Sequence, residues 1–155
     1  MSKTNAMRIL DKEKVDYEVL SYEAKDGLID GISVASKIEK DVKEVYKTLV
    51  GQGKEQVYVF IIPVSQELDL KKAAEASNEK KVELVHVKDI QKLTGYIRGG
   101  CSPIGMKKLY PSFIQKDSLD LENIIVSAGK IGLQIQISPR DLAEQIQGRF
   151  VDIIK

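Results

Sequence analysis

A lysine interrupts an apolar run in the first third of the chain. Lys47 stands in the sequence Val45-Tyr46-Lys47-Thr48-Leu49. On a regular strand its side chain shares a face with Val45 and Leu49. Two interpretations are open. Either the lysine lies at a sheet edge and extends its ammonium to water, or it supplies a cation at the floor of a pocket. Such a cation could hold a phosphate or stabilise an oxyanion.

A glycine-rich segment at residues 95–105 is the second candidate for chemistry. It contains the run Gly99-Gly100-Cys101-Ser102-Pro103. Glycines allow positive φ and close approach, so successive backbone amides of this run could contact a ligand. On the pattern alone, a tight turn without function is the stronger interpretation, because turn chemistry explains both the glycines and the proline.

Cys101 and His86 are the only cysteine and histidine in the sequence. An imidazole can activate a thiol for nucleophilic attack. Against that hypothesis, a free cysteine is more often a small buried hydrophobic residue. A single cysteine forms no internal disulfide, and the usual ligands of a structural zinc site are missing. We therefore expect no metal site and no cofactor.

Four basic residues flank the two glycine-containing turns, namely Arg98, Lys107, Lys108 and Lys130. If both turns lie on one rim, these side chains form a positive patch that could meet RNA phosphates. The alternative is a solvated surface, which is the default for lysines that alternate with acids. The formal net charge of +1 creates no global field for nucleic acid. RNA binding would therefore need this patch or a partner that delivers the RNA.

Helix start signals recur along the chain. Side chains that accept amide hydrogen bonds precede four segments and are predicted to cap helices: Thr4 for a helix ending near Lys14, Ser33 for a short helix from Val34, Asp69 for a helix through Ala76, and Ser138 for the last helix. Asp41 and Glu44 resemble a capping box for one more turn. Residues 88–94 form another helical piece. The last helix has Pro139 at its first position and should present on one face Leu142, Ile146 and Phe150.

Alternation and β-branched residues predict the strands. A strand is expected over residues 15–22, and residues 45–50 and 57–64 should form a hairpin that turns at Gly51-Gln52-Gly53-Lys54. Pro63 should end the pairing or lie on an edge. Three further strands are expected over residues 112–115, 123–127 and 131–137, the last two turning at Gly129-Lys130. The fold class is therefore α+β, with a mixed, largely antiparallel sheet and flanking helices.

Length and composition favour one domain over residues 1–155. The chain is 43% hydrophobic and 30% charged, which suffices for one sizeable core. It has no run of about 18 apolar residues and no apolar start of the signal-peptide type. We expect a soluble, cytoplasmic protein without a membrane segment.

Four blocks of sequence, at residues 45–49, 68–74, 94–105 and 126–133, together resemble one family. The chain is similar to the YbaK/EbsC type of free-standing Cys-tRNA(Pro) deacylase, itself similar to the insertion editing domain of bacterial prolyl-tRNA synthetases. The resemblance covers nearly the whole chain. It implies a YbaK/ProX-like domain and a trans-editing hydrolase that cleaves the ester of mischarged Cys-tRNA(Pro). The implied partners are cysteine-charged tRNA(Pro) and, as an open option, prolyl-tRNA synthetase, with no DNA.

The resemblance also implies roles for individual residues. Lys47 matches the essential catalytic lysine, which anchors the terminal adenosine through its phosphate or the ester oxygens. The motif from Gly99 to Pro103 forms a wall whose backbone holds the aminoacyl group, so that Gly100, Cys101 and Ser102 join the substrate site. Tyr22 matches a tyrosine that closes the pocket. The remaining expected substrate contacts are Thr48 and Gln134.

In this family the thiol of the substrate cysteine is thought to attack its own carbonyl, so the protein mainly orients the thiol and stabilises the oxyanion. Two features depart from the family pattern. Gln134 stands where better-known members carry an aspartate, and residues 28–32 lack an aromatic that some members have. Two alternatives therefore stay open: a non-catalytic module that binds tRNA or a synthetase, and a deacylase for another mischarged tRNA.

Overall fold

The computed structural model describes residues 2–155 of the chain. Helices and strands alternate irregularly along the sequence, in the order α1 (Asn5–Lys12), β1 (Glu18–Ser21), α2 (Gly31–Lys37), β2 (Tyr46–Gln52), β3 (Val57–Pro63), α3 (Leu70–Ser77), β4 (Glu83–Leu84), α4 (Val87–Thr94), β5 (Ser112–Gln115), the 3-10 helix η1 (Lys116–Asp120), β6 (Ile124–Ser127), β7 (Leu133–Ile137), α5 (Pro139–Ile146) and β8 (Arg149–Val151).

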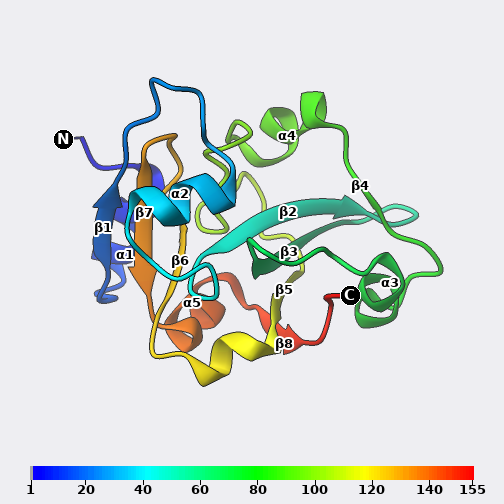
Figure 1. Cartoon of the computed structure of the whole chain (residues 1–155). Coiled ribbons are helices and arrows are strands. Elements are labelled where there is room, and N and C mark those ends of the chain that lie inside the picture. Colours follow the sequence, from blue (N-terminus) through cyan, green and yellow to red (C-terminus); the bar gives the residue numbers. More distant parts are fainter. Residues whose placement is uncertain (1) are drawn as a thin grey trace.

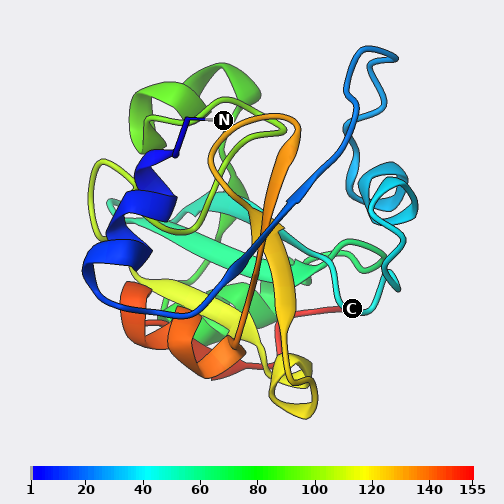
Figure 2. The same ribbon diagram turned by 90° about the vertical axis from the view of Figure 1, so that its left-hand side faces the viewer.

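The strands form two sheets (Figure 1). One has three antiparallel strands in the order β1-β7-β6, and the other has five in the order β4-β2-β3-β5-β8. In the larger sheet, β2 pairs antiparallel with β3 and β4, whereas β5 is parallel to both β3 and β8. Figure 2 shows the smaller sheet crossing in front of the larger one. The predicted α+β class with mostly antiparallel pairing is confirmed.

Three of the four predicted caps are confirmed. Thr4 accepts a hydrogen bond from the amide of Met7 at 3.3 Å, and Ser138 accepts one from Asp141 at 3.4 Å. The Asp69 carboxylate accepts from the amides of Lys71 and Lys72, both at 3.0 Å. Each side chain satisfies amides that the first helical turn leaves without partners.

Two predicted helix starts are wrong. Asp30, not Ser33, caps α2, because the Asp30 carboxylate accepts from the Ser33 amide at 3.1 Å and the helix begins three residues earlier. Asp41 and Glu44 form a hydrogen-bonded turn and no helix. The Asp41 carboxylate accepts from the amide of Lys43 at 2.9 Å, and its carbonyl accepts from Glu44.

Phe150 does not lie on the last helix, as the apolar spacing had predicted. Gln147 adopts a left-handed conformation with φ +52°, which ends α5 at Ile146. Phe150 then pairs with Ile114 in the parallel β5–β8 ladder. The hairpin is confirmed, but its turn lies at residues 53–56, so Gly51 and Gln52 still belong to β2.

The remaining strand predictions hold, with shifts at the ends. Strand β5 agrees residue for residue with the expected segment, and Pro63 is the last residue of β3. Strand β1 is shorter than the expected segment 15–22, and β7 begins two residues later than expected. Short strands β4 and β8 and the 3-10 helix carried no local signal.

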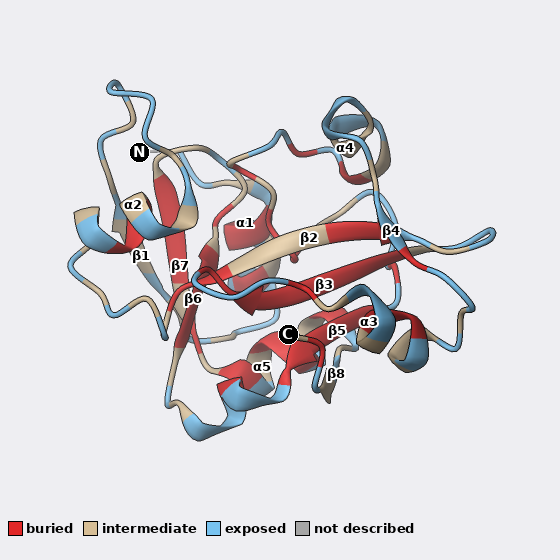
Figure 3. Cartoon of the chain, turned by 45° about the vertical axis from the view of Figure 1, so that its right-hand side comes forward, coloured by how far each residue is buried: buried red, intermediate tan, exposed pale blue. Residues whose placement is uncertain are grey.

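The main core lies between the two sheets and includes the inner faces of α1 and α5. Its members share complete or nearly complete burial, among them Met7, Leu10, Ile61, Ile114, Ile135 and Leu142. A second cluster packs α3 against the opposite face of the larger sheet around Phe60. A small third cluster places Ala35 of α2 against Val45, Val64 and Ile125. Figure 3 shows the buried strands at the centre and the exposed faces of the helices outside.

Within residues 2–155, none of the helices combines the length and the hydrophobicity that a bilayer crossing requires.

Candidate active site

The first half of β2 is a free sheet edge. Strand β4 pairs only with Gly51 and Gln52, and Val50 accepts a hydrogen bond from the amide of Val85. Before that point, within residues 2–155, nothing pairs with the outer side of residues 46–49. The strand start is held at Val45, which bridges to Ile125 of β6 and so joins the two sheets.

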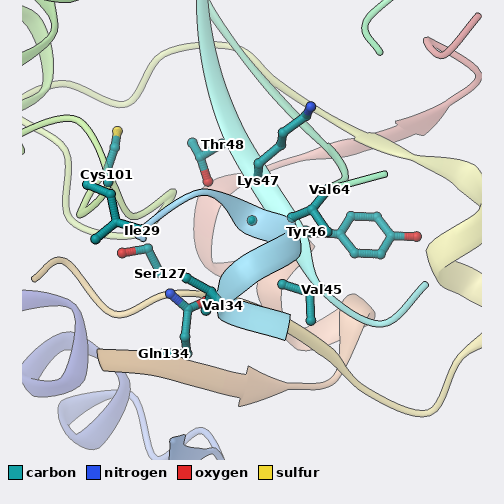
Figure 4. A pocket seen from close by; sticks show the side chains of 12 residues that line it. Ile29, Val34, Val45, Tyr46, Lys47, Thr48, Val64, Cys101, Ser127 and Gln134 are labelled. Atoms are coloured by element: carbon teal, nitrogen blue, oxygen red, sulfur yellow. The ribbon is translucent and has the colours of Figure 1, made fainter. Parts of the chain in front are cut away.

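A cavity of about 120 Å³ lies beside this free edge, where the two sheets meet (Figure 4). Because the cavity meets the edge of β2, side chains from both faces of the strand reach it. Its walls come from β2 and the residue before it, the residue after β3, α2 and the segment before it, the glycine-rich loop and the β6–β7 pair. The lining residues are Ile29, Gly31, Val34, Val45, Tyr46, Lys47, Thr48, Val64, Gly99, Cys101, Ser127 and Gln134.

Lys47 is half-buried and has no carboxylate within salt-bridge distance among the described residues. Burial lowers the pKa of its ammonium, and the charge of Glu67 opposes that shift. In Figure 4 its side chain points away from Ser127 and Gln134, which lie on the far wall. The cavity is therefore cationic on one side only, and Lys47 remains available for an anionic group.

Two hydroxyl groups of the expected site residues are buried and lack hydrogen-bond partners among the described residues. They are Thr48 Oγ1, on the lining, and Tyr22 Oη, which is not on the lining. Leaving a buried hydroxyl unpaired costs about 1–3 kcal/mol. Buried groups without a partner are uncommon in folded proteins, so each of them needs an explanation. The amide of Tyr22 is held by the carbonyl of Gly132 at 2.9 Å.

The glycine-rich loop is pressed against the β6–β7 turn. Gly99 has φ +85°, and a Cβ on Gly100 would lie 3.0 Å from the amide nitrogen of Ile131 and 3.2 Å from the carbonyl carbon of Lys130. These neighbours are backbone atoms, which give way less readily than a flexible side chain, so any side chain at position 100 would have to shift the facing turn by a few tenths of an ångström. Within residues 2–155, no hydrogen bond uses the amide of Gly99 or of Cys101. Both residues line the cavity, and their amides have no partner in the described part of the chain.

Ser102 and Pro103 are buried behind the cavity wall and do not line it. Ser102 Oγ accepts from the amide of Ile104 at 3.2 Å, which fixes the loop's return. Gly100 also lies outside the lining. The structure thus brings Lys47 and Thr48 together with Gly99, Cys101 and Gln134, and it leaves the other expected loop contacts in supporting positions.

Gln134 is buried on β7, and its side-chain amide makes no hydrogen bond within the described part of the chain. An amide donates and accepts but carries no charge. The wall facing Lys47 is therefore polar and neutral, where an aspartate would have placed a carboxylate.

The thiol–imidazole hypothesis fails on geometry. His86 is exposed at the start of α4, whereas the Cys101 sulfur is 4.0 Å from Thr94 Oγ1. Burial raises the pKa of the Cys101 thiol to about 11. A thiol with that pKa is protonated near pH 7 and is a poor nucleophile.

We predict that Cys101→Ser keeps most of the deacylation activity, because the site uses the backbone of this loop. The rate should stay within about threefold of wild type, well below the 100-fold loss typical of a removed catalytic group. Single-turnover deacylation of a charged tRNA measures it, with circular dichroism as the folding control. An inactive but folded variant would show that the sulfur reacts.

The four predicted phosphate contacts are all exposed, namely Arg98, Lys107, Lys108 and Lys130. Lys130 adjoins Gly100 across the loop contact described above. Lys107 is partly engaged, because its ammonium donates to the carbonyl of Lys92 at 3.2 Å.

Sequence reasoning missed Ser127, which lines the cavity at the end of β6, and the apolar wall formed by Ile29, Val34 and Val64. Ser127 lies inside a block that carried the family resemblance. The apolar residues had no distinguishing signal, since nothing in the pattern separates a pocket wall from a core.

No group of three or more histidine, cysteine, aspartate or glutamate side chains within residues 2–155 is arranged to hold a metal ion. The features present instead are one unpaired cation, unpaired hydroxyl and amide groups, and a neutral far wall. They define a small α+β protein whose pocket suits a small group attached to an anionic carrier.

Comparison with known proteins identifies that carrier class. The aminoacyl-tRNA editing domain model matches residues 31–144. A protein of Enterococcus faecalis named as a Cys-tRNA(Pro)/Cys-tRNA(Cys) deacylase, EbsC, is 45% identical over 152 residues, covering 97% of this chain and 93% of that protein. The chain therefore belongs to the aminoacyl-tRNA editing domain family, and the predicted activity, editing of mischarged aminoacyl-tRNA, is confirmed at this level.

Solved structures support the fold. A crystal structure described as a trans-editing enzyme for prolyl-tRNA synthetase superposes with a TM-score of 0.85 over 99% of both chains, at 20% identity. The protein APE2540 superposes with a TM-score of 0.88 over 96% of this chain and 98% of its own, at 19% identity. At these identities the likeness concerns the fold alone.

Proposed function

We propose that this protein hydrolyses the ester of Cys-tRNA(Pro) and so removes cysteine from a mischarged tRNA. The observation that carries the proposal is the cavity of about 120 Å³ with the half-buried Lys47 on one side. An engineered cavity of about 150 Å³ holds a benzene ring, so this one suits a small aminoacyl group. The name of the enterococcal relative supports the same substrate.

In this proposal Lys47 binds the phosphate or ester oxygens of the terminal adenosine. The unused amides of Gly99 and Cys101 polarise the ester carbonyl, which places donors where negative charge develops. Thr48 and Gln134 contact the aminoacyl group, and Tyr22 closes the site from the side of β1. Gly100, Ser102 and Pro103 hold the loop in shape.

The reaction itself needs no protein nucleophile. The sulfur of the substrate cysteine attacks its own carbonyl carbon, forming a C–S bond and breaking the C–O bond to the ribose. The ribose oxygen leaves with the proton that the thiol gives up, and water then opens the thiolactone to free cysteine. The protein contributes orientation and oxyanion stabilisation.

A deacylation panel tests the substrate. Purified protein is mixed with tRNA(Pro) charged with cysteine, alanine or serine, and with Cys-tRNA(Cys). We expect cleavage of the cysteine esters and little cleavage of the others. Equal cleavage of Ala-tRNA(Pro), or no cleavage of either cysteine ester, would contradict the proposal.

We also propose that Arg98, Lys107, Lys108 and Lys130 contact tRNA phosphates, since the four side chains are exposed beside the two loops that meet at the cavity. Replacing Arg98 and Lys130 by alanine should weaken tRNA binding and reduce the slope of log K against log salt by about 1 for each residue. Filter binding from 50 to 200 mM salt measures the slope. Lys54→Ala, on the distant hairpin turn, should leave the slope unchanged.

Prolyl-tRNA synthetase is the proposed delivery partner, because the net charge of +1 gives long-range attraction to tRNA little strength. Adding the synthetase to the deacylation assay should then lower the concentration of this protein needed for half-maximal rate. An unchanged concentration dependence would indicate that the protein works alone.

A further inference from the structure

Residues 23–29 form a segment that links β1 to α2 and is called the 23–29 segment below. In Figures 1 and 2 it projects from the body of the protein as an arch. Its inner end carries Ile29, which lines the cavity. A Cβ on Gly99 would lie only 2.7 Å from the Cδ1 atom of Ile29, so this side chain rests directly on the glycine-rich loop.

The arch holds its own shape through local bonds. The Glu23 carboxylate accepts from the amide of Lys25 at 3.1 Å, and the Asp26 carboxylate accepts from Leu28 at 3.0 Å. Backbone bonds join Gly27 to Ala24 and Ile29 to Gly27. None of these bonds ties the segment to the rest of the protein.

A single side chain supplies that tie. The Lys37 ammonium, at the end of α2, donates to the carbonyl of Glu23 at 2.7 Å, to the carboxylate of Asp26 at 2.7 Å and to the carbonyl of Leu28 at 3.0 Å. These three bonds use every donor that a lysine has. Within residues 2–155, no other hydrogen bond connects the 23–29 segment to a residue outside it.

Lys37 also contacts the residue that precedes the segment. Its nitrogen lies 5.8 Å from the centroid of the Tyr22 ring, within range of a cation–π interaction. The Lys37 side chain is only 21% exposed, whereas Asp26 is 49% exposed. The ammonium is therefore enclosed by the arch, and the bond to Asp26 lowers the pKa of that carboxyl group.

We propose that Lys37 is a positioning residue for substrate binding: it holds the 23–29 segment against the cavity and so keeps Ile29 and Tyr22 where they close on the aminoacyl group. This inference rests on the proposed function for its substrate. Lys37 touches no reacting atom in this scheme, and its effect passes entirely through the segment.

The three hydrogen bonds of Lys37 should affect the affinity for substrate more than the rate of the chemical step. Without them, the free protein spends only part of its time with the segment closed, and apparent affinity falls in proportion to the closed fraction. If that fraction drops to about a tenth, the half-saturating concentration rises about tenfold. Bound substrate restores the closed state, so the rate at saturation should stay within about twofold of wild type.

The test compares Lys37→Met with wild type in single-turnover deacylation of Cys-tRNA(Pro) at increasing protein concentration. Methionine keeps the unbranched stem and removes the donors. Lys37→Arg, which restores cationic donors, should recover most of the lost affinity. Lys40→Met is the matched control. It removes a positive charge three residues from Lys37, and the Lys40 ammonium has no salt-bridge partner in the described chain.

Hydrogen exchange on the substrate-free proteins gives a second readout that does not depend on catalysis. Amides of Gly27 and Ile29 should exchange faster in Lys37→Met, while amides of β2 and β3 stay protected. An unchanged half-saturating concentration beside an active wild type, or unchanged exchange in the segment, would overturn the proposal. A wild type that fails to cleave any cysteine ester would instead refute the proposed function, and the exchange result would still decide whether Lys37 holds the segment.

Discussion

Replacing Lys47 by alanine should lower the single-turnover rate of Cys-tRNA(Pro) deacylation about 100- to 1000-fold, the loss that follows removal of one group stabilising a developing oxyanion. The reason lies in the make-up of the cavity. Lys47 is its one lining residue with a positive charge, and the far wall, with Ser127 and Gln134, is neutral. No neighbouring side chain on the lining can take over the lost charge.

The same substitution should leave stability unchanged or slightly higher. Burial lowers the pKa of Lys47 in the folded protein. The unfolded chain therefore binds this proton more tightly, and stability rises with pH up to the ordinary lysine value of about 10.5. At neutral pH the charge is a cost that alanine removes. Pocket residues commonly trade stability for function in this way.

Thermal denaturation and deacylation rates, measured on the same preparation of Lys47→Ala, test both parts. Lys43→Ala serves as the matched control, because that lysine is exposed on the turn before β2 and lies outside the cavity lining. It should behave as wild type in both assays. A folded Lys47→Ala protein with near-normal turnover would remove Lys47 from its proposed role.

Local signals predicted those parts of the fold that depend on neighbours in sequence. Thr4, Asp69 and Ser138 cap helices as expected, because a short polar side chain before a helical segment meets its first amides. The prediction that Ser33 caps α2 was wrong for the same reason. Asp30 stands three residues earlier, and its carboxylate competes well for the cap position. The prediction that Phe150 lies on α5 was wrong because Gln147 ends the helix in a left-handed conformation, which nothing in the sequence indicates.

Parts that depend on distant contacts could not be predicted. The parallel pairing of β5 with β3 and β8 and the bridge from Val45 to Ile125 join segments far apart in the chain. The free edge of β2 follows from these pairings. It explains why consecutive residues of one strand reach the cavity, although alternation had suggested that only one face would.

For the candidate site, the family resemblance favoured one of the interpretations that the residue pattern alone left open. The residue pattern explained Lys47 equally well by an edge position. The structure shows that the edge interpretation and the pocket interpretation both hold, because the lysine lies on a free edge that borders a cavity. The contact of Gly100 with Ile131 needed the fold, because nothing local says which turn meets which. Lys37 carried no signal at all, as its three acceptors are mostly backbone carbonyls.

The second large effect concerns the substrate. If the thiol of the substrate makes the attack, Cys-tRNA(Pro) should be cleaved at least about 1000-fold faster than Ser-tRNA(Pro) at saturating protein, because loss of the attacking group removes the path that covalent catalysis opens. The lining offers no replacement nucleophile. Burial raises the pKa of Cys101 to about 11, and the hydroxyls of Thr48 and Ser127 have no histidine or carboxylate beside them on the lining.

The difference in side-chain size between cysteine and serine cannot produce a rate ratio of that magnitude. Cysteine and serine side chains differ by one atom, and a pocket that sorts by volume separates such pairs by only about 1–3 kcal/mol, or roughly 10- to 200-fold. Single-turnover rates at saturating protein remove differences in binding, so the remaining ratio reports the chemical step. A ratio near one would exclude attack by the substrate thiol. It would direct attention to a water molecule polarised by the unused amides of Gly99 and Cys101, and Lys47→Ala would then impair both esters equally.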